Sequence, residues 1–189
     1  MGSKDQVFLR HAETQIDFNK PTSQWILTYS GQNRAKRLSA SKEFPKYDDV
    51  YSSKEPKAMA TAKPFADRIN SKIRILTGLE ELDRSATYAE SRAQYNQMVR
   101  EALTDRERSV MSWEPAKDAL KRFSNAIEDI ISHANADEIL IVTHGIVLTL
   151  YFAKLEGKLN KAFERWKKLH FLDWGITSKQ RVIKDIIQH

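Results

Sequence analysis

Short apolar runs alternate with longer amphipathic stretches along the chain. The run at residues 138–143 (EILIVT) is almost entirely apolar, which is typical of a strand that is covered on both faces. Shorter runs of the same kind occur on either side of it. We therefore predict strands at residues 7–9, 49–53, 73–76, 138–143, 171–177 and 181–187.

Four stretches between these runs have the composition or the spacing of helices. Residues 55–69 carry Pro56 near the expected start, where a missing N–H is harmless, and Pro64 deeper, where it should kink the helix or end its first part. Residues 30–43 and 145–155 predict two more helices. The clearest helix is residues 114–133, whose apolar face consists of Ala119, Leu120, Phe123, Ile127, Ile130 and Ile131.

This alternation of strands and helices predicts the fold class. We expect an α/β protein with a three-layer α/β/α sandwich around a mostly parallel sheet. Residues 1–189 are expected to form a single domain, since no linker, internal repeat or low-complexity tract interrupts them. Residues 84–112 are polar and break the alternation, so we interpret them as an inserted helical or loop segment that covers the site.

Composition narrows the compartment and the partners. The chain has no cysteine, which excludes disulfides, thiolate nucleophiles and zinc–thiolate sites and agrees with a cytoplasmic location. No apolar run is long enough to span a bilayer, so we expect no membrane partner. The net charge of +6 favours anionic partners. The basic residues are spread along the chain and form no dense basic block, so a small phosphorylated molecule suits the charge as well as nucleic acid does, and composition alone leaves the two open. The site residues described next lead us to expect a small phosphorylated substrate and make nucleic acid the less favoured partner.

Polar side chains lie at or just after the carboxyl ends of the first four predicted strands. In a parallel sheet, ligands bind beyond the carboxyl ends of the strands, so these residues should lie close together. In chain order they are Arg10 and His11, then Ser52, Ser53 and Lys57, then Glu80, Glu81 and Asp83, and finally Thr143, His144 and Gly145.

Two histidines, two cations and a carboxylate suit phosphoryl transfer. A neutral imidazole is a nucleophile near pH 7 and can carry a phosphoryl group before water removes it. An arginine fork and a lysine charge can bind the phosphate oxygens, while a carboxylic acid protonates the leaving oxygen. Spacing alone does not separate Glu80, Glu81 and Asp83 as that acid; we favour Glu81.

Four segments of the chain resemble the histidine phosphatase superfamily, in its phosphoglycerate mutase-like branch. They are LRHAET (9–14), SSKEPKAMATA (52–62), LEE (79–81) and VTHG (142–145). The resemblance implies His11, Glu81 and His144 as the catalytic residues. It also implies that Arg10 and Lys57 bind the substrate, and it suggests the same role for Asn19.

The chain departs from the pattern of this superfamily at two positions. Ala12 replaces the usual glycine after the histidine, a mild change provided that the backbone there has a negative φ. Lys57 stands where the superfamily has a second arginine. Lysine keeps the positive charge but loses the bidentate fork, so phosphate binding should be weaker or differently oriented.

The resemblance implies a metal-independent phosphomonoester hydrolase, similar to histidine acid phosphatases, that works through a phosphohistidine and needs no cofactor. A phosphoglycerate mutase-type or phosphohistidine-protein phosphatase activity would use the same site, and Lys57 leaves room for a catalytically weak phospho-ligand-binding module. We expect no metal site, because no metal-ligand spacing is present. Ser53 is interpreted as a helix cap, and a homodimer is left open.

Overall fold

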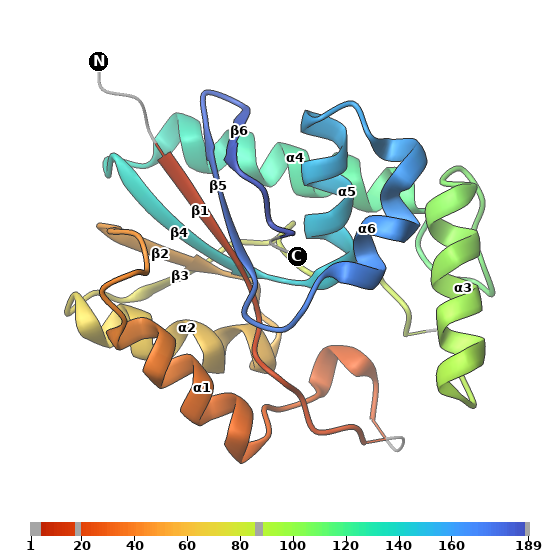
Figure 1. The fold of residues 1–189 in the computed structure, drawn as a ribbon, viewed down its shortest axis with the longest axis horizontal. Coiled ribbons are helices and arrows are strands. Elements are labelled where there is room, and N and C mark those ends of the chain that lie inside the picture. Colours follow the sequence, from red (N-terminus) through yellow and green to blue (C-terminus); the bar gives the residue numbers. More distant parts are fainter. Residues whose placement is uncertain (1–4, 18–19, 86–88, 188–189) are drawn as a thin grey trace.

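A six-stranded sheet crosses the middle of the protein and carries helices on both faces (Figure 1). The computed structural model describes residues 5–17, 20–85 and 89–187. In the order of the sheet, the strands are β3 (Ile73–Ile75), β2 (Asp49–Ser52), β4 (Glu138–Thr143), β1 (Asp5–Arg10), β5 (Trp174–Ser178) and β6 (Arg181–Lys184). The β3–β2, β2–β4 and β4–β1 pairs are parallel, whereas β5 runs antiparallel to β1 and β6.

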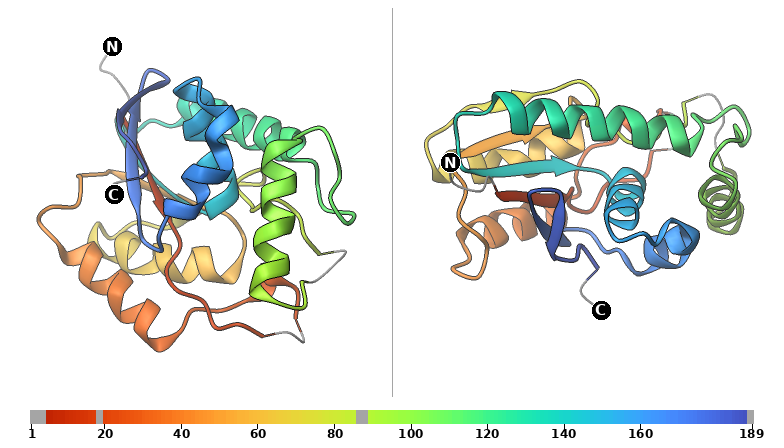
Figure 2. Two further views of the ribbon diagram at one scale, coloured as in Figure 1. Left: turned by 45° about the vertical axis from the view of Figure 1, so that its right-hand side comes forward. Right: turned by 90° about the horizontal axis from the view of Figure 1, so that it is seen from above.

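Two helical layers enclose this sheet (Figures 1 and 2). One layer contains α1 (Tyr29–Ala40) and α2 (Pro56–Arg68), and the other contains α4 (Ala116–His133) and α5 (Gly145–Leu155). Beside α5 lies α6 (Ala162–Lys168), which in turn contacts α3 (Arg92–Thr104). Two short 3-10 turns complete the fold at Thr22–Gln24 and Leu159–Lys161. The predicted α/β/α sandwich with a mostly parallel sheet is confirmed.

The central strands β1 and β4 are largely apolar because each face of the sheet meets a different helical layer. In β1, Val7 and Leu9 pack with α1 and α2, whereas Phe8 between them packs with α4 and α5. In β4, Leu140 and Ile141 likewise face opposite layers. Since successive side chains of a strand alternate between its faces, a strand covered on both sides is apolar over most of its length.

The predicted face of α4 is the face that meets the core. Ala119, Phe123, Ile127 and Ile130 are buried, and Leu120 and Ile131 are partly buried against the same cluster. Helix α5 follows β4 directly and is buried over most of its length, as its apolar sequence predicts. It therefore begins where β4 ends, at the carboxyl edge of the sheet.

The helix boundaries differ from the predictions in three places. Helix α2 continues through Pro64 to Arg68, so this proline does not end its first part. Helix α1 ends at Ala40 rather than at residue 43, and α6 was not predicted. The segment 84–112 contains α3, whose buried residues are Met98, Val99, Ala102 and Leu103, while residues 86–88 lie outside the described part of the chain.

Candidate active site

The register of the sheet brings the two predicted histidines together. Arg10 pairs with Thr143 across β1 and β4, so His11 and His144 leave neighbouring strands at the same edge. The backbone N–H of His11 donates to the carbonyl oxygen of Thr143 at 2.9 Å. The two imidazole rings lie with their centroids 5.2 Å apart, and their exposed fractions are 6% for His11 and 0% for His144.

His11 has the protonation state that a nucleophile needs. Its Nδ1 lies 2.8 Å from the carbonyl oxygen of the next residue, Ala12. Because a carbonyl oxygen only accepts, Nδ1 carries the hydrogen and the lone pair of Nε2 stays free. Burial lowers the pKa of His11 well below 6.5, and the positive charges around it lower it further. The ring is therefore neutral at pH 7.

Alanine at position 12 is compatible with this arrangement. Its backbone is not among the positive-φ residues of the described chain, so no glycine is needed there. The N–H of Ala12 donates to Thr61 Oγ1 at 3.0 Å, and Thr61 in turn donates to the carbonyl oxygen of Lys57. Helix α2 is thereby fixed against the residue that follows His11.

Arg10 is held by a turn near the C-terminus. Its guanidinium donates to the carbonyl oxygen of Leu169 at 2.6 Å, and its central carbon lies 4.4 Å from the ring centroid of Phe171. A Cβ on Gly145 would lie 3.2 Å from that carbon, so the glycine lets the guanidinium lie close to the start of α5. Phe171 also lies 5.6 Å from His11, ring to ring, and nothing in the sequence pattern singles it out.

Lys57 lies in the site, but two of its three N–H groups already donate hydrogen bonds to protein atoms. Its Nζ donates to the carbonyl oxygen of Thr22 at 2.7 Å and to the carboxylate of Glu55. The exposed fractions are 3% for Lys57 and 5% for Glu55. Burial lowers the pKa of the Lys57 ammonium, while the charge of Glu55 opposes this effect. Among the described residues, no acceptor takes the third N–H of Lys57.

Ser53 has a different role from the one that the sequence predicts, and Glu55 is a residue of the site that the sequence did not indicate. Ser53 was predicted to cap the helix, but the N-cap residue of α2 is Glu55. The hydroxyl of Ser53 lies 2.7 Å from Nε2 of His144 instead. Glu55 was not predicted at all, because a glutamate just before Pro56 resembles an ordinary solvated helix start. Both side chains belong to the site.

The three candidate acids lie in different surroundings. Glu81 lies in the loop after β3, and its side chain reaches the start of α5. There its carboxylate accepts the backbone N–H groups of Ile146 at 3.0 Å and Val147 at 3.1 Å. It also accepts the N–H of its own neighbour, Leu82. Glu80 instead accepts the N–H of Gly78, and Asp83 is exposed. Of the three, Glu81 is the one at the helix that follows His144.

Arg84 is a further cation that the sequence patterns did not identify. It follows Glu81 by three residues, donates to the Tyr95 hydroxyl, and lies 5.3 Å from the ring of Tyr95 and 5.9 Å from that of Trp113. Burial is the main cause of the low pKa of His144, and the charges of Lys57 and Arg84 lower it further. The charge of Arg84 therefore acts on His144.

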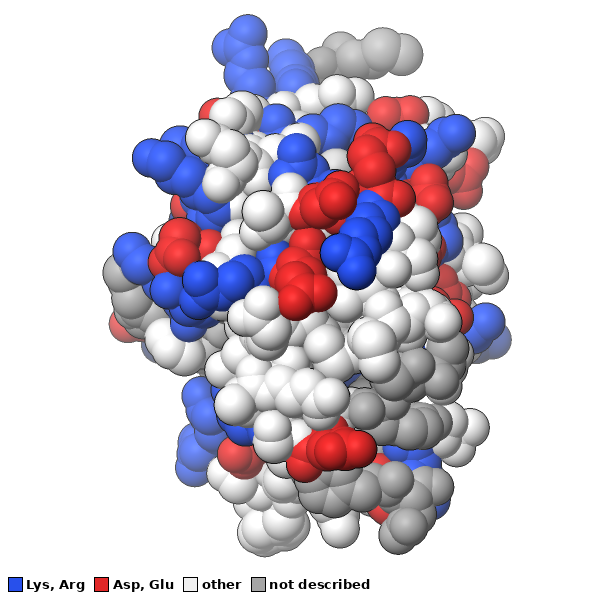
Figure 3. All heavy atoms as spheres, turned by 90° about the vertical axis from the view of Figure 1, so that its right-hand side faces the viewer, with Lys and Arg blue, Asp and Glu red and all other residues white. Residues whose placement is uncertain are grey.

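Asn19, the remaining predicted binding residue, lies outside the described residues. Within residues 5–17, 20–85 and 89–187, no group of three or more His, Asp and Glu side chains could hold a metal ion. No helix in the same ranges is long and apolar enough to cross a bilayer. Basic and acidic side chains are interspersed on the face that carries α3 (Figure 3), which does not resemble a basic surface for nucleic acid.

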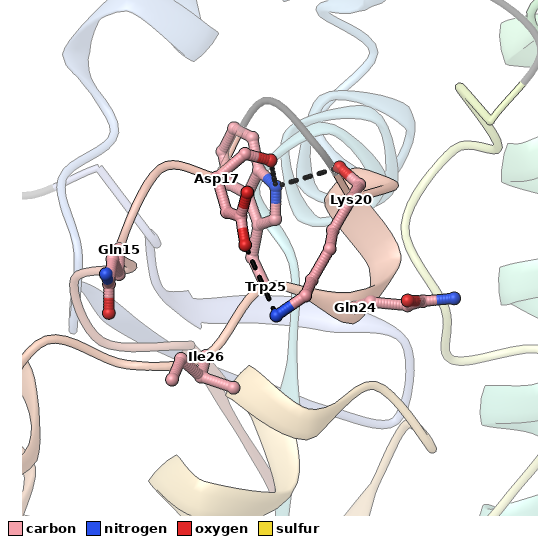
Figure 4. A pocket seen from close by; sticks show the side chains of 6 residues that line it. All are labelled: Gln15, Asp17, Lys20, Gln24, Trp25 and Ile26. Carbon is pink, nitrogen blue, oxygen red and sulfur yellow. Dashed lines mark hydrogen bonds and ion pairs between the residues drawn. The ribbon is translucent and has the colours of Figure 1, made fainter.

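A separate cavity lies in the loop after Thr14 (Figure 4). Its volume is about 120 Å³. Trp25 closes the loop by donating from Nε1 to the carbonyl oxygens of Asp17 at 2.9 Å and Lys20 at 3.2 Å. The same loop supplies Thr22, the backbone acceptor of Lys57. The lining residues are Gln15, Asp17, Lys20, Gln24, Trp25 and Ile26.

Comparison with known proteins identifies the family of this chain and the proteins that share its fold. Residues 7–176 match the Histidine phosphatase superfamily (branch 1). The fold resembles the alpha-ribazole phosphatase from Shigella flexneri (19% identity, 98% of this chain and 96% of that chain covered, TM-score 0.75) and Bacillus stearothermophilus YhfR (20%, 95% and 94%, TM-score 0.77). It also resembles a mycobacterial glucosyl-3-phosphoglycerate phosphatase (17%, 92% and 89%, TM-score 0.73). Among curated protein sequences, none matches.

The chain therefore belongs to the histidine phosphatase superfamily, and its fold is that of the phosphoglycerate mutase-like members. The family match includes every predicted site residue, from Arg10 to His144.

Proposed function

We propose that this protein hydrolyses phosphomonoesters through a phosphohistidine formed on His11, without a metal ion. The observation that carries the proposal is the neutral, buried imidazole of His11, 5.2 Å from that of His144 and beside the charges of Arg10 and Lys57. A nucleophile with a free Nε2 lone pair among fixed cations is what transfer of a charged phosphoryl group requires.

In the first step, Nε2 of His11 attacks phosphorus and the bond from phosphorus to the ester oxygen breaks. Arg10, Lys57 and His144 stabilise the negative charge on the three equatorial oxygens. The leaving oxygen takes a proton from Glu81. Oε2 of Glu81 accepts one backbone N–H, at Ile146, which leaves a second lone pair for that proton.

In the second step, a water molecule attacks the phosphohistidine. Glu81, now a carboxylate, takes a proton from the water as its oxygen bonds to phosphorus. The phosphorus–nitrogen bond breaks and its electron pair returns to Nε2. Inorganic phosphate leaves, and both His11 and Glu81 regain their starting protonation states.

The substrate class is a small phosphorylated molecule. Two phosphatases with this fold act on quite different molecules, a ribazole phosphate and a glucosyl-3-phosphoglycerate, according to their names. In this chain the segment 84–112 is proposed to cover the site and, with the loop after Thr14, to set specificity. The acid-phosphatase-like subtype, the cytoplasmic location and a homodimer stay predictions.

Hydrolysis of p-nitrophenyl phosphate tests the proposal. We expect turnover by the wild-type protein, no effect of EDTA, inhibition by vanadate, and no turnover by a folded His11→Ala variant. Brief incubation with a ³²P-labelled substrate should leave an acid-labile, base-stable label that maps to His11. Hydrolysis that persists in His11→Ala would contradict the assignment.

A second candidate is a phospho-ligand-binding module with little catalysis. The observation that favours it is the buried ion pair between Lys57 and Glu55. In this pair the Glu55 carboxylate neutralises the ammonium group of Lys57, which would otherwise be free to bind phosphate. Tight binding of a phosphorylated ligand in calorimetry, with no turnover of a panel of phosphomonoesters, would favour this module over the hydrolase.

A further inference from the structure

Glu55 is a buried carboxylate in an unusual position. It is the N-cap residue of α2, yet its side chain makes no capping hydrogen bond. Its Oε2 accepts from Lys57, and its Oε1 accepts the N–H of Glu81 at 2.9 Å and lies 3.3 Å from Nε2 of His144. A side chain at this position normally stabilises its own helix. Here the carboxylate is directed at the site instead.

The two ring nitrogens of His144 have different surroundings. Nε2 lies within reach of Ser53 and Glu55, at 2.7 and 3.3 Å. Nδ1 is buried and has no hydrogen-bond partner among the described residues. The hydroxyl of Ser53 can donate or accept, whereas the carboxylate oxygen of Glu55 can only accept, so the presence of Glu55 favours the neutral tautomer with its hydrogen on Nε2. The bare lone pair of Nδ1 is then the polar atom left for a ligand.

A bare lone pair repels a phosphate dianion, so the neutral ring and the bound anion are mismatched. In the empty site, burial and then the charges of Lys57 and Arg84 lower the pKa of His144 well below 6.5. A dianion reverses that balance by adding two negative charges. The charged or titratable groups around His144 come from four places in the fold. They are Glu55 and Lys57 at the start of α2, Arg10 and His11 at the end of β1, Glu81 and Arg84 after β3, and Arg122 on α4.

We propose that Glu55 is a positioning residue whose carboxylate holds Nε2–H of His144, so that binding of a dianionic phosphoryl group is coupled to uptake of one proton at Nδ1. The proton comes from solvent, and the imidazolium then donates Nδ1–H to a phosphoryl oxygen and Nε2–H to Glu55. The inference rests on the proposed function, because it concerns the same anion site. It gives the Lys57–Glu55 pair a purpose beyond neutralising a buried ammonium.

Calorimetry with inorganic sulfate measures the coupling directly. Sulfate is a tetrahedral dianion with no proton to exchange near neutral pH, so any proton uptake belongs to the protein. Titrations of the whole chain at pH 7.5 in two buffers of different ionisation enthalpy should give uptake of about one proton per bound sulfate. In Glu55→Gln, which keeps an oxygen for the N–H of Glu81, uptake should fall to less than half.

Glu164→Gln is the matched control, because it breaks an exposed Glu–Lys pair with Lys167 on α6. Its proton uptake should equal that of the wild-type protein. His144→Gln should bind sulfate without uptake, and it replaces Glu55→Gln as the decisive variant if the latter does not fold.

Sulfate binding by the wild-type protein without uptake, or equal uptake in Glu55→Gln and wild type, would overturn the role of Glu55. If the protein still hydrolysed p-nitrophenyl phosphate through His11 in that case, the proposed function would stand. A chain that neither binds sulfate nor hydrolyses the ester would overturn both proposals.

Discussion

The candidate site has two halves that are built in different ways. The strand-end half, Arg10, His11 and His144, is positioned by the pairing of β1 with β4 in the centre of the sheet. The loop half, Glu55, Lys57 and Arg84, lies after β2 and β3 and is positioned by ion pairs and ring contacts between side chains. The first half depends on backbone geometry, and the second on the identity of its partners.

This difference separates what the fold provides from what this chain adds. Parallel strands that are buried on both faces fix the spacing of the residues that follow them, whatever lies on the loops. The loop half can change whenever two partners change together, as Lys57 and Glu55 illustrate. We therefore expect the nucleophile and its arginine to define the reaction, and the loop half to tune affinity and specificity.

The largest effect is expected from the strand-end half. His11→Gln removes the nucleophile while it keeps a polar side chain of similar size. Turnover of p-nitrophenyl phosphate should fall by about 10⁴-fold or more, as for other catalytic nucleophiles. Steady-state rates measure the fall, with circular dichroism to show that the variant folds.

His133→Gln is the control for this change, because His133 is exposed on α4, away from the sheet edge. Its turnover should match the wild-type rate. A His11→Gln variant that keeps more than a tenth of the activity would show that the strand-end half does not carry the chemistry.

In the loop half, Lys57→Met should reduce stability. The substitution leaves the Glu55 carboxylate buried without its cation, and breaking a buried pair in this way typically costs about 3–5 kcal/mol. Urea unfolding should therefore show a lower midpoint at an unchanged slope. Lys63→Met, which breaks an exposed pair with Asp67 on the same helix, should change the midpoint far less. An equal loss in both variants would argue against a buried ion pair.

Stability should also depend on pH through the two histidines of the strand-end half. Burial lowers the pKa of both below 6.5, so under acidic conditions the unfolded chain binds more protons than the folded protein. The free energy of unfolding should fall as the pH drops below about 6.5, by up to about 1.4 kcal/mol per pH unit for each histidine. Above that pH their contribution should be flat.

Urea unfolding between pH 5 and pH 8 measures this slope. A His11→Gln/His144→Gln double variant removes both groups and should lose that part of the dependence. Identical pH profiles for this variant and the wild-type protein would mean that neither ring is held neutral by the fold.

The strand-end half could be predicted from the sequence because its cause is local. An apolar strand that stops at Arg10-His11, and another that stops at Thr143-His144, already imply two imidazoles at one edge of a parallel sheet. The six strands and the face of α4 were predictable for the same reason, since the strands follow from short apolar runs and the helix face from a period of hydrophobic positions. The last two strands are displaced or shorter than predicted, at Trp174–Ser178 and Arg181–Lys184.

The loop half could not be predicted because its causes are not local. Glu55 gains its role from Lys57 and from His144, which lies 89 positions further along the chain. Phe171 reaches Arg10 from a turn near the C-terminus, and Arg84 depends on the rings of Tyr95 and Trp113. No pattern in a single sequence marks such contacts. The one indication in the sequence was that Lys57 stands where the superfamily has an arginine, which suggested that the loop half of this chain differs from that of other members.

The smallest effect tests whether Arg84 belongs to the loop half at all. Arg84→Gln removes a positive charge beside His144 and Lys57 but touches neither the nucleophile nor the sheet. We expect KM for p-nitrophenyl phosphate to rise by about tenfold, or about 1.4 kcal/mol, with a smaller change in kcat. Arg84→Lys keeps the charge without the planar fork, so its KM should lie between that of the wild-type protein and that of Arg84→Gln.

Arg100→Gln provides the control for Arg84, because Arg100 also lies over an aromatic ring, 4.6 Å from Phe163, but on the exposed side of α3. Its KM should equal that of the wild-type protein. If Arg84→Gln lowers the unfolding midpoint and leaves KM unchanged, Arg84 is a packing residue between α3 and the site. The loop half would then consist of the Glu55–Lys57 pair alone.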